Sequence, residues 1–312
     1  EKYLGIKVDR AKHAADLRVA LGGLKGPLMK VAQMLATIPD AVPKEYAAEL
    51  AHLQADAPSM GWPFVRRRMA AELGANWEKK FRTFGREAAA AASLGQVHKA
   101  ETLGGEAVAC KLQYPDMASA VEADLGQFKT ILNLFERMDP AFRTAQVQAE
   151  IAARLREELD YTREGQALEM FRAMLADEPG VRVPRLHPDL STRRLLTMDW
   201  VDGSRLMNLR GASQEARNTL ALNMFRAWYM PFYYYGIIHG DPHPGNYLAT
   251  PDNTIHLLDF GCIRVFPPRF VAGVIGLYRA LKAGEEEGIV EAFRHWGFRD
   301  LKRETIDILT VW

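Results

Sequence analysis

The sequence has little cysteine, no excess of charge of either sign and no long apolar run. Its 312 residues include two cysteines, Cys110 and Cys262, which argues against a disulfide framework and favours a reducing compartment. Lys and Arg total 40 against 39 Asp and Glu, and the net charge of +1 argues against nucleic acid as a partner, since domains that bind it are usually strongly basic. No signal peptide is recognisable, and no run of 18 apolar residues predicts a membrane span.

What is present predicts an α+β protein. Hydrophobic residues make up 48% of a chain that is long enough for two lobes or one large domain. We expect a helical region over 1–80, a mixed region over 81–202 and a mostly helical region over 203–312, with a hinge at 202–204. Helices are expected over 11–38, 43–54, 62–73, 115–138, 146–176, 213–235, 270–281 and 285–296, and strands at 81–84, within 88–100, and at 107–113, 182–186 and 194–201. The expected core stripe of the helix over 213–235 consists of Leu220, Met224, Phe225, Trp228 and Phe232.

The strongest chemical pattern is a pair of loops, each preceded by a strand-like apolar run. The first reads His-Gly-Asp-Pro-His-Pro-Gly-Asn over 239–246, and the second reads Asp-Phe-Gly over 259–261. In protein kinases and their relatives an Asp with this spacing to an Asn meets the incoming hydroxyl, while the Asn and the Asp of Asp-Phe-Gly bind Mg²⁺. Asp241 is therefore the candidate catalytic residue, and Asn246 and Asp259 are the candidate metal ligands. Either loop alone is compatible with an ordinary turn, but the two in order favour a phosphoryl-transfer site.

A candidate nucleotide-binding region precedes these loops. Lys111 lies in the middle of an apolar strand, like the kinase lysine that pairs with the α- and β-phosphates, although a strand lysine can also be an ordinary exposed residue. Where a kinase has a glycine-rich loop, this sequence has the alanines at 88–92, then Ser93, with Gly95 at the end. Alanine disfavours positive φ, so we expect this loop to be stiff and partly helical; an alanine-rich turn without a ligand is the alternative.

A phosphate-binding lysine needs an acidic partner, and the helix predicted over 146–176 offers three carboxylates. Asp160 and Glu164 are four residues apart and share a face, whereas Glu158 lies about 200° from Asp160 around an ideal helix. The three therefore cannot serve one partner, and a solvated charged face is the alternative. In the first predicted helix, Lys30 and Gln33 taken alone would likewise be a solvated face.

Together these motifs resemble the UbiB (AarF-domain) atypical kinases, over the stretch from about Leu24 to at least Gly261. Four signatures occur in family order: Lys30 to Gln33, the alanine-rich loop over 88–97, Glu158-Leu159-Asp160, and the two loops over 239–246 and 259–261. The family pattern at the first is Lys-x-Gly-Gln, and this sequence has Ala32 where Gly is usual. The added methyl group affects how closely that helix can pack.

The resemblance implies a bilobal protein-kinase-like fold, with an N-terminal helical extension lying across the site where a protein substrate would dock. In that arrangement the extension is 1–80, the N-lobe 81–202 and the C-lobe 203–312. Lys30 and Gln33 would face the active site with Glu158 and Asp160 as partners, and Lys111 would pair with Glu164. Expected contacts of ATP or ADP are Ala90, Ala91, Ala92, Ser93, Val97, Ala109, Lys111, Met198, Asp199 and Val201.

The resemblance also implies a function and a location. The family is similar to Mg-ATP-dependent ATPases needed for ubiquinone biosynthesis, held back from protein phosphorylation by the extension and the alanine-rich loop. Expected partners are a membrane lipid or isoprenoid quinone precursor and proteins of quinone biosynthesis, and the expected location is cytoplasmic and peripheral at the inner membrane. Two alternatives stay open: a small-molecule or lipid phosphotransferase, because such kinases share the His-Gly-Asp-x-His-x-Gly-Asn loop, and a nucleotide-gated lipid-binding or protein-binding module.

Overall fold

The computed structural model describes residues 60–92, 94–138, 145–241, 243–299, 301, 305, 306 and 309. The helices predicted over 11–38 and 43–54, with Lys30 and Gln33, lie outside the described residues, and so does Ser93. The described chain forms two compact units. Unit 1 contains the residues up to Glu169 together with Pro184–Val201, and unit 2 contains Met170–Val183 and the residues from Asp202 onward.

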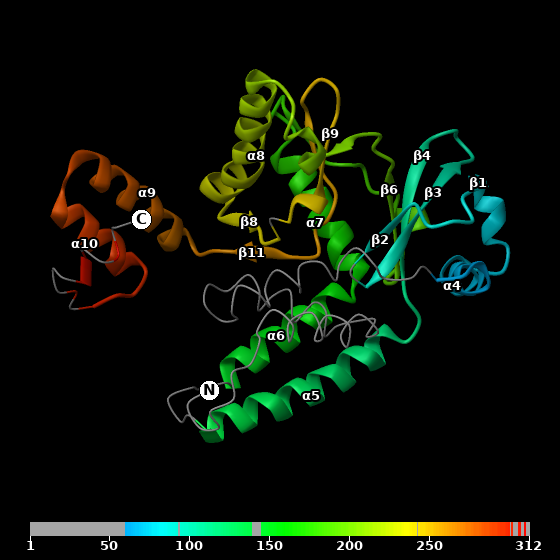
Figure 1. The fold of residues 1–312 in the computed structure, drawn as a ribbon, viewed down its shortest axis with the longest axis horizontal. Helices are drawn as coiled ribbons and strands as arrows, with labels where there is room; N and C mark the ends of the chain where they lie inside the picture. Colours follow the sequence, from blue (N-terminus) through cyan, green and yellow to red (C-terminus); the bar gives the residue numbers. More distant parts are fainter. Residues whose placement is uncertain are drawn as a thin grey trace, which may run out of the picture. The chain divides into compact units, whose positions relative to one another are not determined.

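Unit 1 is built on an antiparallel sheet (Figure 1). Its strands are β1 (Phe81–Phe84), β2 (Ala90–Ala92), β3 (Gly95–Thr102), β4 (Ala107–Gln113) and β6 (Leu195–Asp199), in the order β1-β3-β4-β6 with β2 paired to β3. Gly105, the second residue of the Gly104-Gly105 pair, lies in the turn between β3 and β4 at φ +86°, a conformation that favours glycine. The predicted helix over 62–73 is confirmed as α4 (Trp62–Leu73), with Pro63 in its first turn and Gly74 as its C-cap.

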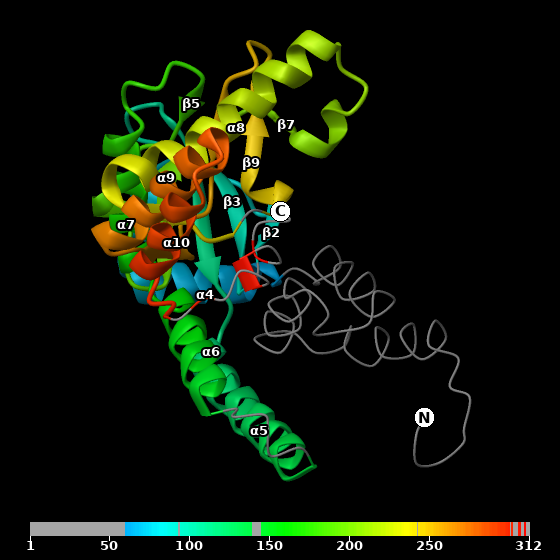
Figure 2. The same ribbon diagram turned by 90° about the vertical axis from the view of Figure 1, so that its left-hand side faces the viewer.

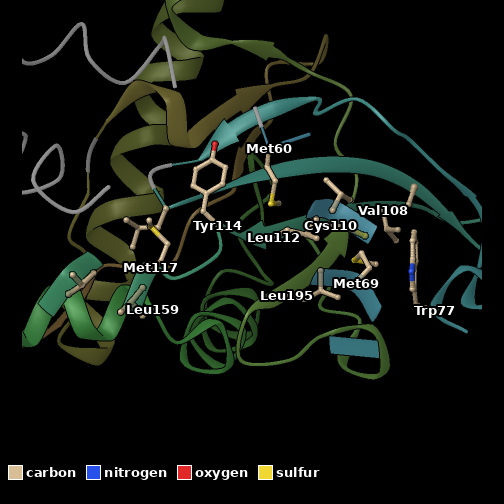
Figure 3. Close-up of a cluster of buried hydrophobic side chains, with 14 of the residues drawn as sticks. Met60, Met69, Trp77, Val108, Cys110, Leu112, Tyr114, Met117, Leu159 and Leu195 are labelled. Carbon is tan, nitrogen blue, oxygen red and sulfur yellow. The ribbon is translucent and has the colours of Figure 1, made fainter. Parts of the chain in front are cut away.

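One face of this sheet carries the hydrophobic core of unit 1. Val108, Cys110 and Leu112 alternate along β4 and are fully buried, together with Leu195 of β6. Figure 3 shows them beside Met69 of α4 and Trp77 of a short 3₁₀-helix (Trp77–Lys80). The residues between them on β4 point to the opposite face, so the alternation divides the sheet into a core face and a second face that is available for function.

The alanine-rich segment is a strand rather than a partly helical loop, so this expectation was wrong. Ala90, Ala91 and Ala92 pair with Val97, Gln96 and Gly95 in an antiparallel register, and the Ala89 N–H donates to the Val97 carbonyl (2.8 Å). Pairing with β3 supplies the backbone hydrogen bonds that a helical turn would have made locally. This tertiary pairing outweighs the helix propensity of alanine, which is worth only tenths of a kcal/mol to about 1 kcal/mol per residue.

Three helices follow β4 where the sequence predicted two long ones. They are α5 (Met117–Met138), α6 (Ala145–Glu158) and α7 (Tyr161–Met174), and α5 and α6 lie side by side (Figures 1 and 2). Helix α5 begins after the predicted Pro115, because the Tyr114 N–H is still bonded to the Leu94 carbonyl and the chain turns at Asp116 (φ +55°). The predicted helix over 146–176 breaks between Glu158 and Tyr161. The argument that placed Glu158 and Asp160 on opposite faces of one helix therefore fails.

Unit 2 combines two small sheets with three helices. One sheet has the order β5-β10-β9-β7, formed by Val181–Arg182, Ile255–Leu257, Tyr247–Ala249 and Ser204–Arg205, and the other pairs β8 (Ile237–His239) with β11 (Ile263–Val265). The helices are α8 (Gln214–Tyr235), α9 (Pro268–Ala283) and α10 (Glu286–His295), close to the predicted ranges. Short 3₁₀-helices complete the described elements at Leu206–Leu209 and Pro244–Asn246 in unit 2 and at Pro188–Leu190 in unit 1.

Two sequence expectations change in this part of the chain. Phe225, expected in the core stripe of α8, is 53% exposed, whereas Leu220 and Phe232 of that stripe are buried. The segment over 182–186 forms only the short β5 and a bridge from Leu186 to Met198.

Cys110 and Cys262 are both thiols, and none of the helices in the described ranges is long and apolar enough to cross a bilayer.

Candidate functional site

Unit 1 contains a buried ion pair between Lys111 and Glu164. The Lys111 Nζ donates to Glu164 Oε1 at 2.6 Å, and their side chains are only 8% and 3% exposed. Glu164 lies in the first turn of α7, where the helix dipole also favours a carboxylate. Tyr161, at the start of the same helix, places its ring 5.1 Å from Lys111 Nζ. The expected pairing of Lys111 with Glu164 is thus confirmed, and the ring of Tyr161 is a contact that the sequence pattern missed.

The other two acids occupy the break between α6 and α7. Asp160 caps α7, because its Oδ1 accepts from the Thr162 N–H (3.0 Å), and its Oδ2 lies 3.6 Å from Arg193 Nε. Glu158 is the last residue of α6, and its Oε2 atom is buried. The assignment of these acids to Lys30 and Gln33 stays a prediction, since those two residues lie outside the described chain.

Strand register brings most of the expected nucleotide contacts onto one face of the sheet. Val97 pairs with Ala90 on one side and with Lys111 on the other, and Ala109 pairs with Met198. Directly paired residues of antiparallel strands project to the same side, and residues two apart on β4 do so as well. Ala90, Val97, Ala109, Lys111 and Met198 therefore share the face opposite the hydrophobic core, and Lys111 supplies a positive charge on it.

Asp199 does not belong to this set by its side chain. It pairs with Val108, whose side chain lies in the core, so the register turns the Asp199 side chain away from the Lys111 face. Its carboxylate accepts from the Arg185 N–H (3.1 Å) and lies 2.8 Å from His187 Nε2. Asp199 and Val201 stay predicted nucleotide contacts, and the register indicates that Asp199 would make its contact on the Lys111 face through backbone groups.

In unit 2, His239 links the two loops that carry the candidate catalytic and metal-binding groups. Its Nδ1 accepts from the Asp241 N–H (3.3 Å), while its Nε2 donates to the Asp259 carbonyl. Because Nδ1 accepts and Nε2 donates in these two bonds, the ring hydrogen is assigned to Nε2. The buried His239 side chain therefore holds together the main chain at Asp241 and the main chain at Asp259.

The polar groups around Asp241 and Asp259 are held by local hydrogen bonds. Asp241 Oδ1 accepts from the His243 N–H (3.2 Å), and its carbonyl accepts from Asn246 Nδ2 (3.3 Å). Asp259 Oδ1 accepts from the Gly261 N–H (2.9 Å). Burial, followed by the charges of Asp241 and Asp259, raises the pKa of Tyr247 to about 12, although its hydroxyl accepts from Trp228 Nε1 (2.8 Å). Both candidate carboxylates therefore lie near one buried phenol.

The rings of Phe171 and Phe260 pack against the ring of His239. Its ring centroid lies 5.8 Å from that of Phe260 and 6.1 Å from that of Phe171, which is itself 5.3 Å from Phe260. Phe171 and Phe260 are 0% and 1% exposed. The cluster joins α7 to the Asp-Phe-Gly segment within unit 2, and so fixes the loop that carries Asp259. Sequence reasoning missed Phe171, because no local signal marks a buried aromatic as a support for a distant loop.

Comparison with known proteins places this arrangement in a family. Residues 52–293 match the profile of the ABC1 atypical kinase-like domain. The chain belongs to the ABC1 atypical kinase-like family. It is 34% identical over 250 residues to the atypical kinase COQ8, mitochondrial, of Saccharomyces cerevisiae. It is 32% identical over 281 residues to the protein ACTIVITY OF BC1 COMPLEX KINASE 3, chloroplastic, of Arabidopsis thaliana, and 30% over 275 residues to AarF domain-containing protein kinase 1 of Xenopus laevis.

The aligned regions cover 80%, 88% and 85% of this chain but only 50%, 40% and 52% of these ABC1-family relatives. The chain therefore spans about half the length of the curated relatives it matches. Among solved structures, the complex of Rv3197 with erythromycin from Mycobacterium tuberculosis matches with a TM-score of 0.69 at 29% identity, covering 96% of this chain and 77% of that one. The predicted family and the kinase-like α+β fold are both confirmed.

Proposed function

We propose that this chain binds Mg-ATP and hydrolyses it in support of ubiquinone biosynthesis, and that it is held back from phosphorylating proteins. The observation that carries the proposal is the buried Lys111–Glu164 pair at 2.6 Å. Burying an ion pair is costly, and replacing it by apolar residues is often neutral or stabilising, so its presence here favours a role beyond stability. An ammonium group held by a carboxylate is suited to the α- and β-phosphates of a nucleotide.

The residues of unit 2 fit the magnesium that such a reaction needs. Mg²⁺ prefers oxygen ligands and usually takes some of them from substrate phosphates and water. Asn246 uses its Nδ2 on the Asp241 carbonyl, so its Oδ1 would be the ligand atom, and Asp259 would supply a carboxylate.

The chain's own groups have separate tasks in this proposal. Bound Mg²⁺ would neutralise the charge of the transferred phosphoryl group. Asp241 orients the attacking water or hydroxyl and accepts its proton, and its position is fixed by the backbone bond to His239 Nδ1 (3.3 Å). Lys111 orients the nucleotide phosphates while Glu164 orients Lys111. His239 holds the Asp241 and Asp259 segments together through its two hydrogen bonds.

The proposed pathway is supported by the names of relatives, and the proposed location by the family resemblance. One 34% identical relative is named COQ8, mitochondrial, and others are named as chloroplastic kinases of the ABC1 group. We propose the same pathway here, with a membrane lipid or isoprenoid quinone precursor and quinone-biosynthesis proteins as partners. The proposed site of action is the cytoplasmic face of the inner membrane.

The test is phosphate release from Mg-ATP by the purified chain, with and without vesicles of anionic lipid. We expect release that the vesicles stimulate and that Asp259→Asn abolishes, because this change removes the charge of a metal ligand while keeping its size. Nucleotide binding without release under either condition would overturn the ATPase proposal.

A nucleotide-gated binding module is the second candidate, and one observation favours it. The solved relative Rv3197 is described in complex with erythromycin, so a protein of this fold at 29% identity holds a small organic ligand. A phosphotransferase acting on such a small molecule or a lipid is the third reading, supported by the His239-Gly240-Asp241 sequence. The Asp259→Asn variant separates them: a binding module retains ligand binding without turnover, whereas a phosphotransferase loses transfer of labelled phosphate to the acceptor.

A further inference from the structure

Gln96 of β3 holds the main chain at Met60 through both ends of its side-chain amide. Its Oε1 accepts from the Met60 N–H (2.5 Å), and its Nε2 donates to the Met60 carbonyl (3.2 Å). The side chain thereby fills the donor and acceptor positions that a neighbouring strand would use. Gln96 is 1% exposed and Met60 9%, and the Met60 side chain lies in the hydrophobic cluster drawn in Figure 3. These two bonds are shielded from water.

His98, two residues along the same strand, fixes which way the Gln96 amide faces. Its Nε2 lies 2.7 Å from Gln96 Nε2, and its Nδ1 lies 2.8 Å from the Gly85 carbonyl. Because an amide nitrogen only donates and a carbonyl only accepts, the ring must carry its hydrogen on Nδ1 and accept at Nε2. The opposite amide orientation would set the Gln96 oxygen against the Met60 carbonyl. A single ring tautomer of His98 and a single amide orientation of Gln96 therefore satisfy every donor and acceptor in the chain of hydrogen bonds that links Gly85, His98, Gln96 and Met60.

This contact lies directly beside the alanine-rich strand. Gln96 pairs in register with Ala91 of β2 and with Leu112 of β4. Met60 is also the residue through which the preceding part of the chain, with Lys30 and Gln33, joins the described part of unit 1. We propose that Gln96 is a positioning residue that anchors the chain at Met60 beside the alanine-rich strand, and that His98 sets the orientation of its amide. An effect of this anchor, the two bonds from Gln96 to Met60, on nucleotide turnover rests on the proposed function. The two bonds themselves are independent of that function.

Protonation of His98 would undo this arrangement. A hydrogen on Nε2 would face the amide hydrogens of Gln96, and rotating that amide to accept it would break both bonds to Met60. The groups packed on the ring are neutral: Phe84 of β1 stacks at 5.4 Å, and the register partner on β4 is Cys110, whose thiol pKa is raised by burial to about 12. Burial lowers the pKa of His98 from 6.5, against the opposing effect of the Gly85 bond. The anchor is therefore intact near neutral pH and loosens in acid.

The first test is hydrogen exchange of the segment around Met60 in the whole chain, compared between Gln96→Leu and Gln113→Leu. Gln113 is a matched control, since it is a buried glutamine of the same sheet whose Nε2 donates to the Leu159 carbonyl (3.2 Å) and not to Met60. Loss of the bonds to Met60 should raise exchange there roughly tenfold in Gln96→Leu only. Unchanged exchange in Gln96→Leu, or an equal rise in Gln113→Leu, would overturn the anchor.

The second test measures hydrogen exchange at Met60 as a function of pH. It does not require Gln96→Leu, so it can still refute the proposal if that variant fails to fold. After correction for the intrinsic rate, exchange at Met60 in the unmodified chain should rise as pH falls below 6.5, the ordinary histidine pKa. His98→Asn can still donate toward Gly85 but has no group that titrates, so its exchange should show no such step. A step that persists in His98→Asn, or none in the unmodified chain, contradicts the assigned role of His98.

The effect of the anchor on nucleotide turnover is measured by enzyme kinetics, separately from hydrogen exchange at Met60. Because the anchor lies beside β2, Gln96→Leu should raise the KM for ATP with little change in kcat. A KM for ATP that is unchanged in Gln96→Leu would overturn the link to nucleotide binding. Absence of phosphate release from the unmodified chain would refute the proposed ATPase while leaving the exchange result at Met60 to decide the anchor.

Discussion

At the scale of single residues, Glu164 is the carboxylate that pairs with Lys111, the proposed nucleotide-binding lysine. Glu164→Gln keeps the size of the side chain but removes the carboxylate charge from a buried ion pair, since the two side chains are 3% and 8% exposed. We expect the free energy of unfolding to fall by about 3 kcal/mol, the usual cost of breaking a buried pair, and the affinity for ATP to fall with it. Urea denaturation and nucleotide titration measure the two effects.

The matched control for Glu164 is Glu122→Gln, because Glu122 makes a similarly short contact with Arg156 (2.7 Å) while both side chains remain more than half exposed. Solvent screens such a pair, so neither stability nor ATP affinity should change measurably. Equal losses in the two variants would contradict the special role of the Lys111 partner.

The two cysteines should also differ at this scale. Burial raises the pKa of the Cys110 thiol to about 12, so it is protonated and shielded in the folded protein, whereas Cys262 is partly exposed. Reaction with a thiol reagent at pH 8 should modify one cysteine in the native protein and both in urea, since thiolates are the reactive form. Peptide mapping that finds Cys110 modified in the native protein would contradict its burial.

At the scale of elements, the approach of β3 to β4 requires glycine at position 95. A Cβ added to Gly95 would lie 2.0 Å from the Leu112 carbonyl oxygen, which is backbone and cannot move without disturbing the pairing. Gly95→Ala should therefore destabilise unit 1 by on the order of 3 kcal/mol, measured by thermal or urea denaturation. In Gly104→Ala the nearest atom is Thr102 Oγ1 at 3.6 Å, an ordinary contact, so this variant should retain its stability. Equal stability of the two variants would refute the close approach.

At the scale of the whole molecule, acid should destabilise the fold through His98, which is buried, and His256, which is half-buried. Burial lowers the pKa of both His98 and His256 from 6.5. Just below pH 6.5 the unfolded chain binds protons that the folded chain does not, so the free energy of unfolding decreases as pH falls from that value. Replacing both residues with Asn should flatten this decrease, measured by urea denaturation between pH 5 and 8.

The control for the pH effect is His295→Asn, since the side chain of His295 on α10 is 42% exposed. This variant should keep the pH dependence of the unmodified chain. A profile that flattens as much in His295→Asn as in the double variant would contradict the assignment to His98 and His256.

The sequence by itself determined the features that depend on local chemistry. Gly105 predicts the hairpin between β3 and β4, and the apolar run around Lys111 predicts a buried strand, because turns and strands follow from φ preferences and alternation over a few residues. Spacing alone likewise predicts the roles of Asp241, Asn246 and Asp259. The structure adds their local hydrogen bonds, and the roles stay predictions.

Only the tertiary structure decided which backbone groups found distant partners. The break between α6 and α7 arises because Gln113 donates to the Leu159 carbonyl (3.2 Å) and the Tyr161 N–H donates to the Arg193 carbonyl (2.9 Å), bonds that a continuous helix would have made within itself. The alanines became a strand because β3 lay beside them, and Asp199 faces away from Lys111 because register with β4 sets its side. Such pairings join residues far apart in sequence, so no local propensity could predict them.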